Sequence, residues 1–283
     1  MTPMDGQPKA RVVRPAIVQC QEPGCANEFE ERAPTFMGVR TSSPYCPACR
    51  NRKVAELDQH EAAIKDRSRA YRRQEWAHQQ VPRRYWEKTL DNFDASDGEN
   101  QRRVEDFRVY MASFPVDEPP HGFRSLLIAR DINGVGKTHL ACAILGGIIE
   151  RHPDPASEGS PFQFWSAMAI KARLQAAQRF SATETTEQVY NHFSRVRLLV
   201  VDDVGKEMVG SDYDSAFLKE MYFGIINGRY NNDLPMVLTA NLGFQPWEGS
   251  NISLTDLMGS AAVSRLMEMA GGIQYVIEGK DRR

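Results

Sequence analysis

The sequence lacks a long apolar segment. Its longest apolar runs, such as residues 198–201, fall far short of the roughly 20 residues that a membrane-spanning helix needs. Residues 1–10 also lack the apolar region of a secretory signal. We therefore expect a cytoplasmic protein without a membrane partner.

A strong charge bias, internal repeats and low-complexity tracts are also missing. The net charge is only −2, with a small basic excess in residues 1–90 and a small acidic excess in the rest. A basic front can favour nucleic acid or an acidic partner, but so slight an asymmetry decides little. What is present is a chain of 283 residues, 41% of them hydrophobic, which is enough for one full core and a small extra module.

Cysteine is scarce outside one cluster near the N-terminus. Two closely spaced cysteine pairs joined by an intervening stretch are typical of a structural zinc site with four thiolate ligands. Disulfides are the poorer interpretation in a reducing compartment, and redox-active or free thiols remain alternatives. Metal binding would supply the folding energy of so small a module. The four expected zinc ligands are Cys20, Cys25, Cys46 and Cys49.

Residues 51–80 are polar and free of proline and glycine, which predicts a long, mostly exposed helix. A solvated connector and a partner-binding or DNA-facing helix are both open interpretations. Val81-Pro82 ends this helix. We expect residues 1–15 to form a loose tail. The predicted domains are a zinc module (residues 1–50), a helical linker (51–81) and a third domain (82–283).

A glycine-rich turn, residues 131–138, lies between a short apolar run and a helical pattern. Strand, glycine turn, Gly-Lys-Thr and helix together predict a phosphate-binding loop of the Walker A type. In this loop Lys137 would reach the terminal phosphates of a nucleotide, and Thr138 would place its hydroxyl on Mg²⁺. Asp131 stands where the first glycine belongs, and we expect the turn to survive because Asp tolerates left-handed backbone. The nucleotide-binding residues that we expect are Asn133, Gly134, Val135, Gly136, Lys137, Thr138 and His139.

Four buried-type residues, 198–201, run directly into two carboxylates, Asp202 and Asp203. Ligands bind at the carboxyl ends of parallel strands, so these acids would lie near the nucleotide, as in a Walker B motif. Asp202 would hold Mg²⁺ through water. Asp203 would orient or deprotonate the attacking water.

A further β-type run, residues 234–241, ends in polar side chains. A side chain at the end of this run can sense the terminal phosphate of the nucleotide. Asn241 is the first candidate for this role and Thr239 is the second. Strands alternate with helices along the chain, which predicts an α/β fold with a parallel sheet covered by helices on both faces. Two helical patterns, 167–180 and 254–270, carry further basic residues.

Taken in order, these motifs resemble the ATPase domain of the bacterial and phage replicative helicase loaders of the DnaC/DnaI type. This group of AAA+ ATPases also includes the transposition helper IstB. The resemblance covers residues 82–283 and implies an AAA+ P-loop fold with ATP and Mg²⁺ as cofactors. Its motifs are Pro82–Tyr85, Leu90–Phe93, Gly134–Ala141, Leu199–Gly205, Ile226–Tyr230, Leu234-Pro235, Thr239–Asn241, Ser264–Leu266 and Gly279–Arg282.

The resemblance also implies roles for basic residues. Arg265 would be an arginine finger that completes the ATP site of a neighbouring subunit in a homo-oligomer. Lys171, Arg173 and Arg179 would contact phosphates along a single-stranded DNA channel. Loaders of the DnaI kind carry a zinc-binding domain before the ATPase, which the cysteines would match. The catalytic set would be Lys137, Asp202, Asp203, Asn241 and Arg265.

We therefore expect an ATPase that loads a DnaB-type replicative helicase hexamer onto single-stranded DNA, in a bacterium or for a phage. Asp203 is one methylene shorter than the glutamate of many AAA+ enzymes, so hydrolysis would be slow and switch-like. One alternative is an IstB-like helper that acts with a transposase on duplex DNA. Another is a nucleotide-gated adaptor that binds ATP and DNA or protein but hardly hydrolyses.

Overall fold

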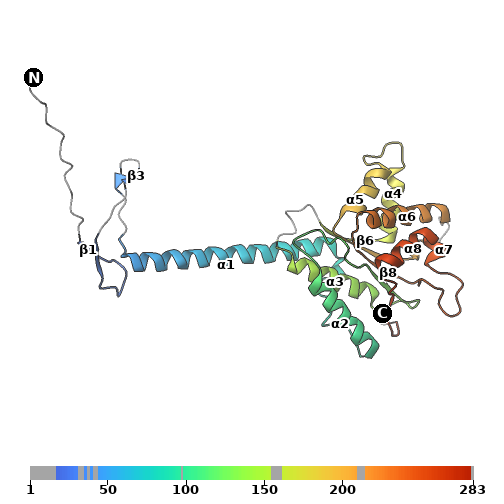
Figure 1. The fold of residues 1–283 in the computed structure, drawn as a ribbon, viewed down its shortest axis with the longest axis horizontal. Helices are drawn as coiled ribbons and strands as arrows, with labels where there is room; N and C mark the ends of the chain where they lie inside the picture. The colour runs from blue at the N-terminus through green and yellow to red at the C-terminus, as the bar shows by residue number, and fades with distance from the viewer. Residues whose placement is uncertain are drawn as a thin grey trace, which may run out of the picture. The chain divides into compact units, whose positions relative to one another are not determined.

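The structure is a computed structural model (Figure 1). It groups the chain into two compact units, residues 1–68 and 69–283. The loose tail expected at residues 1–15 and most of the loop expected at 152–161 lie outside the described residues. The described residues are 17–30, 35–36, 39–40, 44–96, 98–153, 161–208 and 214–281.

The first unit contains two short antiparallel hairpins and the beginning of a long helix. Strands β1 (Ile17–Gln19) and β2 (Glu28–Glu30) form one hairpin, and β3 (Thr35–Phe36) and β4 (Val39–Arg40) form the other. So few apolar side chains cannot support a domain by themselves, which is why the cysteines matter here. The cluster at its centre, within the described residues, consists of Cys20, Cys46 and Cys49, with Cys25, Phe29 and Tyr45 packed against them.

Helix α1 (Pro47–Gln80) begins earlier than the predicted residue 51. Proline suits the first helical turn, where its missing N–H would have no partner. The apolar side chains Val54, Leu57, Ile64 and Tyr71 of this helix are exposed, as the polar pattern predicts, whereas Trp76 near its end is buried. Within the described residues, no helix combines the length and the apolar character that a bilayer crossing requires.

The second unit is built on a five-stranded sheet in which every pairing is parallel. The strand order is β6-β7-β8-β5-β9. This confirms the predicted α/β fold with a parallel sheet. The strands are β5 (Leu126–Ala129), β6 (Phe162–Ser166), β7 (Leu198–Val204), β8 (Met236–Ala240) and β9 (Tyr275–Val276).

Helices cover both faces of this sheet. Successive residues of a strand point to opposite faces, so continuous apolar strands have apolar side chains on both faces that need cover. In β5, Leu126 belongs to one buried cluster and Leu127 to the other. Helices α2 and α3 pack in the cluster of Leu126, whereas α4 to α8 pack in the cluster of Leu127. The helices are α2 (Gly98–Ser113), α3 (Lys137–Arg151), α4 (Ala167–Ala177), α5 (Thr186–Arg195), α6 (Ser215–Asn231), α7 (Leu254–Met258) and α8 (Ser260–Met269).

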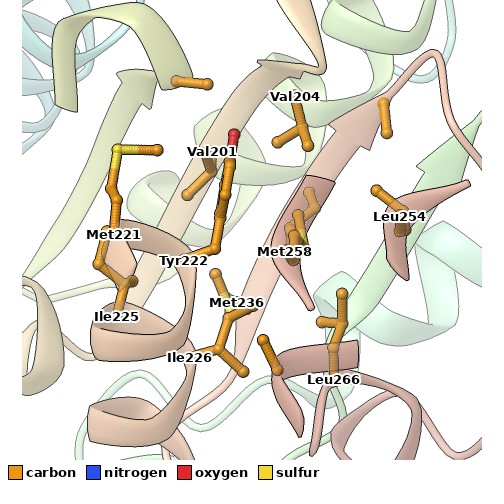
Figure 2. Packing of buried hydrophobic residues seen from close by; sticks show 14 of the residues in the cluster. Val201, Val204, Met221, Tyr222, Ile225, Ile226, Met236, Leu254, Met258 and Leu266 are labelled. Carbon is orange, nitrogen blue, oxygen red and sulfur yellow. The ribbon is translucent and has the colours of Figure 1, made fainter. Parts of the chain in front are cut away.

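Figure 2 shows how α6 packs against the sheet. Met221, Tyr222 and Ile226 of α6 share one buried cluster with Val201 and Val204 of β7. This packing fixes the carboxyl end of β7, where the two candidate acids lie.

One predicted element is wrong in the structure. The sequence pattern predicts a single helix over residues 254–270, but the chain forms α7 and α8 with a break at Gly259. Gly259 has a φ of 80°, which continues no right-handed helix. Ser253 and Asp256 form a capping box that starts α7, which therefore begins separately from α8.

Candidate functional site

The glycine-rich turn connects β5 to α3, and its glycines adopt backbone angles that other residues avoid. Gly134 has a φ of 75° and Gly136 a φ of 100°. A side chain at Gly136 would also collide with Phe93, because an added Cβ would lie 2.5 Å from a Phe93 ring carbon. Asp131 is not among the described non-glycine residues with positive φ. The turn therefore forms without a left-handed backbone conformation at Asp131.

Lys137 stands at the start of α3 and is largely buried. Its ammonium Nζ donates to the carbonyls of Arg130 and Ile132, each at 2.8 Å. Burial lowers the pKa of Lys137 to about 8. The loop thus holds the Lys137 ammonium group close to backbone carbonyls. Phosphates can compete for this ammonium group because phosphates carry full negative charge and carbonyls do not.

The carboxylate of Asp202 lies between two hydroxyl groups. Thr138 donates to Oδ2 at 3.2 Å and Thr239 to Oδ1 at 2.5 Å. Burial raises the pKa of Asp202 to about 6. Side chains from α3, β7 and β8 therefore meet at the carboxyl edge of the sheet, where the sequence predicts the nucleotide.

Asp203 follows at an irregularity in the β7–β8 pairing between Val201 and Val204. Its φ is 61°, and its backbone N–H donates to the Thr239 hydroxyl at 2.9 Å. Bulges are frequent next to functional sites, and this irregularity lies at the two candidate acids. The Asp203 carboxylate forms an ion pair with Lys206 in the short 3₁₀ helix η3 (Lys206–Met208).

The two candidates for sensing a terminal phosphate occupy different places. Asn241 donates from its amide to Asn133 Oδ1 at 3.2 Å, so it contacts the phosphate-binding loop. Thr239, the second candidate, contacts Asp202 instead. Their assignment as sensors stays a prediction.

A segment before the sheet closes the site and was not predicted to do so. His139 Nε2 lies 2.8 Å from the Thr89 carbonyl, and the ring of Phe93 packs on His139. Burial raises the pKa of Tyr85, and the nearby Thr138 opposes that shift. Tyr85 belongs to the 3₁₀ helix η1 (Arg83–Tyr85). Tyr85 and Phe93 lie in two of the sequence motifs, but the motifs do not indicate these contacts, because the contacts join residues about 50 positions apart that only the fold brings together.

A pocket of about 350 Å³ lies between this segment and the glycine turn. Its walls include basic and acidic side chains together with backbone of the turn. Its lining comprises Arg84, Tyr85, Lys88, Asn92, Phe93, Asp94, Asn133, Gly134, Gly136, Lys137, Thr138, His139, Asp203 and Lys206. A larger pocket of about 850 Å³ lies elsewhere, beside the amino ends of β6 and β7, and none of the predicted nucleotide-binding or catalytic residues lines it.

The three basic residues predicted to contact DNA differ in exposure. Lys171 is only 7% exposed, and its charge acts on the buried Glu207. Arg173 makes two hydrogen bonds to Glu184, at 2.9 and 2.6 Å. Arg179 is exposed beyond the end of α4. Lys171 is therefore largely buried, and the contact of these three residues with DNA stays a prediction.

Arg265 lies on α8, away from the pocket of its own chain. Its guanidinium stacks over the rings of Phe223 and Tyr230, at 5.3 and 5.6 Å from their centroids. It also donates to the Ala261 carbonyl at 3.0 Å. An arginine finger acts on a neighbouring subunit, so this position within one chain leaves the prediction untested.

The four N-terminal cysteines converge in the first unit. Their sulfur atoms all lie within 4.8 Å of one another, and all four are free thiols rather than disulfides. The Cys46 N–H donates to Cys20 Sγ at 3.2 Å, and Asn27 donates to Cys46 Sγ at 3.9 Å. Such donors stabilise thiolates, so the residues present fit a tetrahedral four-thiolate metal site.

No curated protein matches the chain. The fold resembles that of a DnaC helicase loader, with 25% identity and a TM-score of 0.52 over 70% of this chain and 100% of that chain. It also resembles DnaI, with 18% identity and a TM-score of 0.52 over 72% and 94% of the two chains. A putative primosome component of Streptococcus pyogenes serotype M3 has 17% identity and a TM-score of 0.50, over 72% and 92%.

The last two similarities concern the fold alone, which is that of the AAA+ P-loop NTPases. A family model described as IstB-like ATP binding protein matches residues 53–278, which is most of the chain. The chain therefore belongs to the IstB/DnaC-like family of ATP-binding proteins.

Proposed function

We propose that the chain hydrolyses ATP and uses it to load a replicative DNA helicase onto single-stranded DNA. The observation that carries the nucleotide part is the meeting of Thr138, Asp202 and Thr239 beside a phosphate-binding loop. The proposal places the domains at residues 1–50, 51–81 and 82–283, in a cytoplasmic protein.

In this proposal the Lys137 ammonium leaves the carbonyls of Arg130 and Ile132 and pairs with the terminal phosphates of ATP. The N–H groups of the turn around Gly134 and Gly136 donate to the same phosphates. The exchange is favourable because a carbonyl dipole is replaced by full negative charges.

Oxygen ligands such as the Thr138 hydroxyl and the Asp202 carboxylate suit Mg²⁺, and the two are already hydrogen-bonded at 3.2 Å. Mg²⁺, when bound, neutralises phosphate charge. Thr239 holds the other oxygen of Asp202 and so fixes the direction of the carboxylate. The four cysteines would likewise hold zinc as a structural ion.

Three further residues act on the reaction in this proposal. Asp203 orients the attacking water and accepts its proton. Asn241 detects the terminal phosphate from its place against Asn133. Arg265 reaches the ATP of a neighbouring copy and stabilises the charge that develops there. Hydrolysis then acts as a switch between assembled and released states.

The helicase part of the proposal is supported by the DnaC helicase loader, whose whole length aligns with this chain at 25% identity. The proposed partners are a DnaB-type hexamer, single-stranded DNA and further copies of this chain. The cysteine cluster and the exposed α1 are the proposed contacts to the helicase, because they lie outside the nucleotide pocket.

The ATPase part is tested by titrating the full chain with a fluorescent ATP analogue and by measuring phosphate release with DNA and helicase present. Lys137→Ala should abolish binding, and Asp203→Asn should bind ATP but lose turnover. Lys219→Ala changes an exposed lysine of α6 outside the pocket and should leave both unchanged. Binding that survives Lys137→Ala would refute the site.

The IstB name of the family favours a second candidate, a transposition helper that acts with a transposase on duplex DNA. Footprinting on duplex and single-stranded DNA separates the two candidates. ATP-dependent protection of duplex DNA, without helicase binding, would favour the helper.

A further inference from the structure

The acid proposed to act on water does not stand alone in the pocket. Lys206, three residues after Asp203, forms an ion pair with the Asp203 carboxylate. Their side chains are 45% and 30% exposed, and both residues line the nucleotide pocket. The ammonium therefore occupies part of the surface of the carboxylate that faces the pocket.

A buried acid fixes the turn that presents Lys206. Glu207 is 1% exposed and accepts the Gly205 N–H at 3.1 Å and the Tyr222 hydroxyl. Gly205 has a φ of 102°, so the chain reverses sharply after β7. Because Glu207 points inward, its neighbour Lys206 is directed outward, toward Asp203.

The same anchor connects the turn to two helices. Tyr222 belongs to α6, and the charge of Lys171 on α4 acts on Glu207. A shift of α4 or α6 would move the turn and with it the Lys206 ammonium.

An ion pair with an ammonium weakens a carboxylate as an acceptor. A group that orients or deprotonates water must accept a hydrogen bond from that water, and Asp203 shares this capacity with Lys206.

We propose that Lys206 is a positioning residue that holds Asp203 in a resting state, so that ATP turnover is limited until the ion pair opens. This inference rests on the proposed ATPase function and adds a restraint to it. Breakage of the pair accelerates hydrolysis and leaves ATP affinity unchanged, because Lys206 acts through Asp203 rather than through the phosphates.

The test compares full-length Lys206→Met, Lys206→Arg and Lys219→Met with the unchanged protein. For each we would measure ATP affinity by analogue titration, then kcat and KM, and the midpoint of thermal unfolding. Lys219 is an exposed lysine outside the pocket and serves as the matched control.

Lys206→Met should raise kcat about two- to fivefold, which is the range that a partly exposed ion pair can supply. KM and ATP affinity should not change, and Lys206→Arg should keep the low kcat because it preserves the pair. In an Asp203→Asn background Lys206→Met should give no gain, since the restrained acid is already absent.

A lower ATP affinity in Lys206→Met would overturn the inference by making Lys206 a phosphate ligand. An unchanged kcat would overturn it by making the pair a surface contact without function. In both cases ATP binding that depends on Lys137 would leave the proposed function standing. If the unchanged protein binds no ATP, the proposed function falls as well.

Discussion

At the scale of single residues, the site joins groups whose properties depend on burial. Asp202 keeps its carboxylate between two hydroxyls, whereas Asp203, its direct neighbour, faces the pocket. Two adjacent carboxylates thus have different environments, at an irregularity in the β7–β8 pairing. Different environments allow different roles, metal binding for one and proton acceptance for the other.

The length of Asp203 can be tested directly. Asp203→Glu should raise kcat by up to about tenfold, because a shortfall of about 1 Å in the position of a catalytic group can cost as much as a hundredfold. Stability should fall slightly, since Glu tolerates the φ of 61° less well than Asp. Phosphate release measures the effect on kcat, and denaturant unfolding measures the effect on stability. A kcat that does not increase counts against the idea that the short side chain of Asp203 makes hydrolysis slow.

The sequence places the two motifs at one site, and their roles stay a prediction, but it does not indicate which other side chains contact them. Thr138 and Asp202 are joined as the two motifs predict. Phe93 and Lys206 were not predicted for the site, because one packs from a distant segment and the other lies in an ordinary turn after β7. The burial of Lys171 was not predicted either, since a basic residue in a helical pattern reads as exposed unless its buried partner is known.

At the scale of elements, the alternation of short apolar strand patterns with helical patterns predicts the parallel sheet and its flanking helices. It does not predict the strand order, in which β5 lies between β8 and β9. Nor does it predict the break at Gly259, because the apolar spacing continues across it. The break depends on one backbone angle, which periodicity does not encode.

Two glycines give opposite predictions for the same substitution. Gly146→Ala should stabilise the protein by about 0.5–1 kcal/mol, because Gly146 lies within α3 with open space around it. Gly259→Ala should destabilise it by about 1–2 kcal/mol, because the φ of 80° is costly for alanine even though space is available. Urea unfolding measures both, and equal effects would contradict the backbone assignment at Gly259.

At the scale of the whole molecule, the two units depend on different sources of stability. The second unit has apolar clusters on both faces of its sheet, whereas the described part of the first unit has a cysteine cluster with little apolar cover. We therefore expect the first unit to need a metal and the second to fold without one. The sequence predicted the cysteine cluster. It did not predict a division between units near residue 68, because helix α1 continues across that position and no sequence signal marks it.

Metal removal should separate the two units functionally. The full chain should contain one zinc ion by elemental analysis, and Cys46→Ser or a chelator should remove it. Helicase binding should then be lost while ATP binding remains, because the nucleotide pocket contains no cysteine. Cys142→Ala is the matched control, since Cys142 is buried in α3 and should not affect zinc content. Loss of ATP binding together with zinc would contradict independent units.

The most direct test of the account is the capture of a replicative helicase hexamer by the full chain in the presence of ATP. A variant that lacks residues 1–68 retains the compact second unit and serves for comparison. The account predicts that the full chain captures the hexamer, and that the shortened chain binds ATP but captures none. Equal capture by both chains would contradict the role of the first unit, and capture by neither would contradict the helicase loader itself.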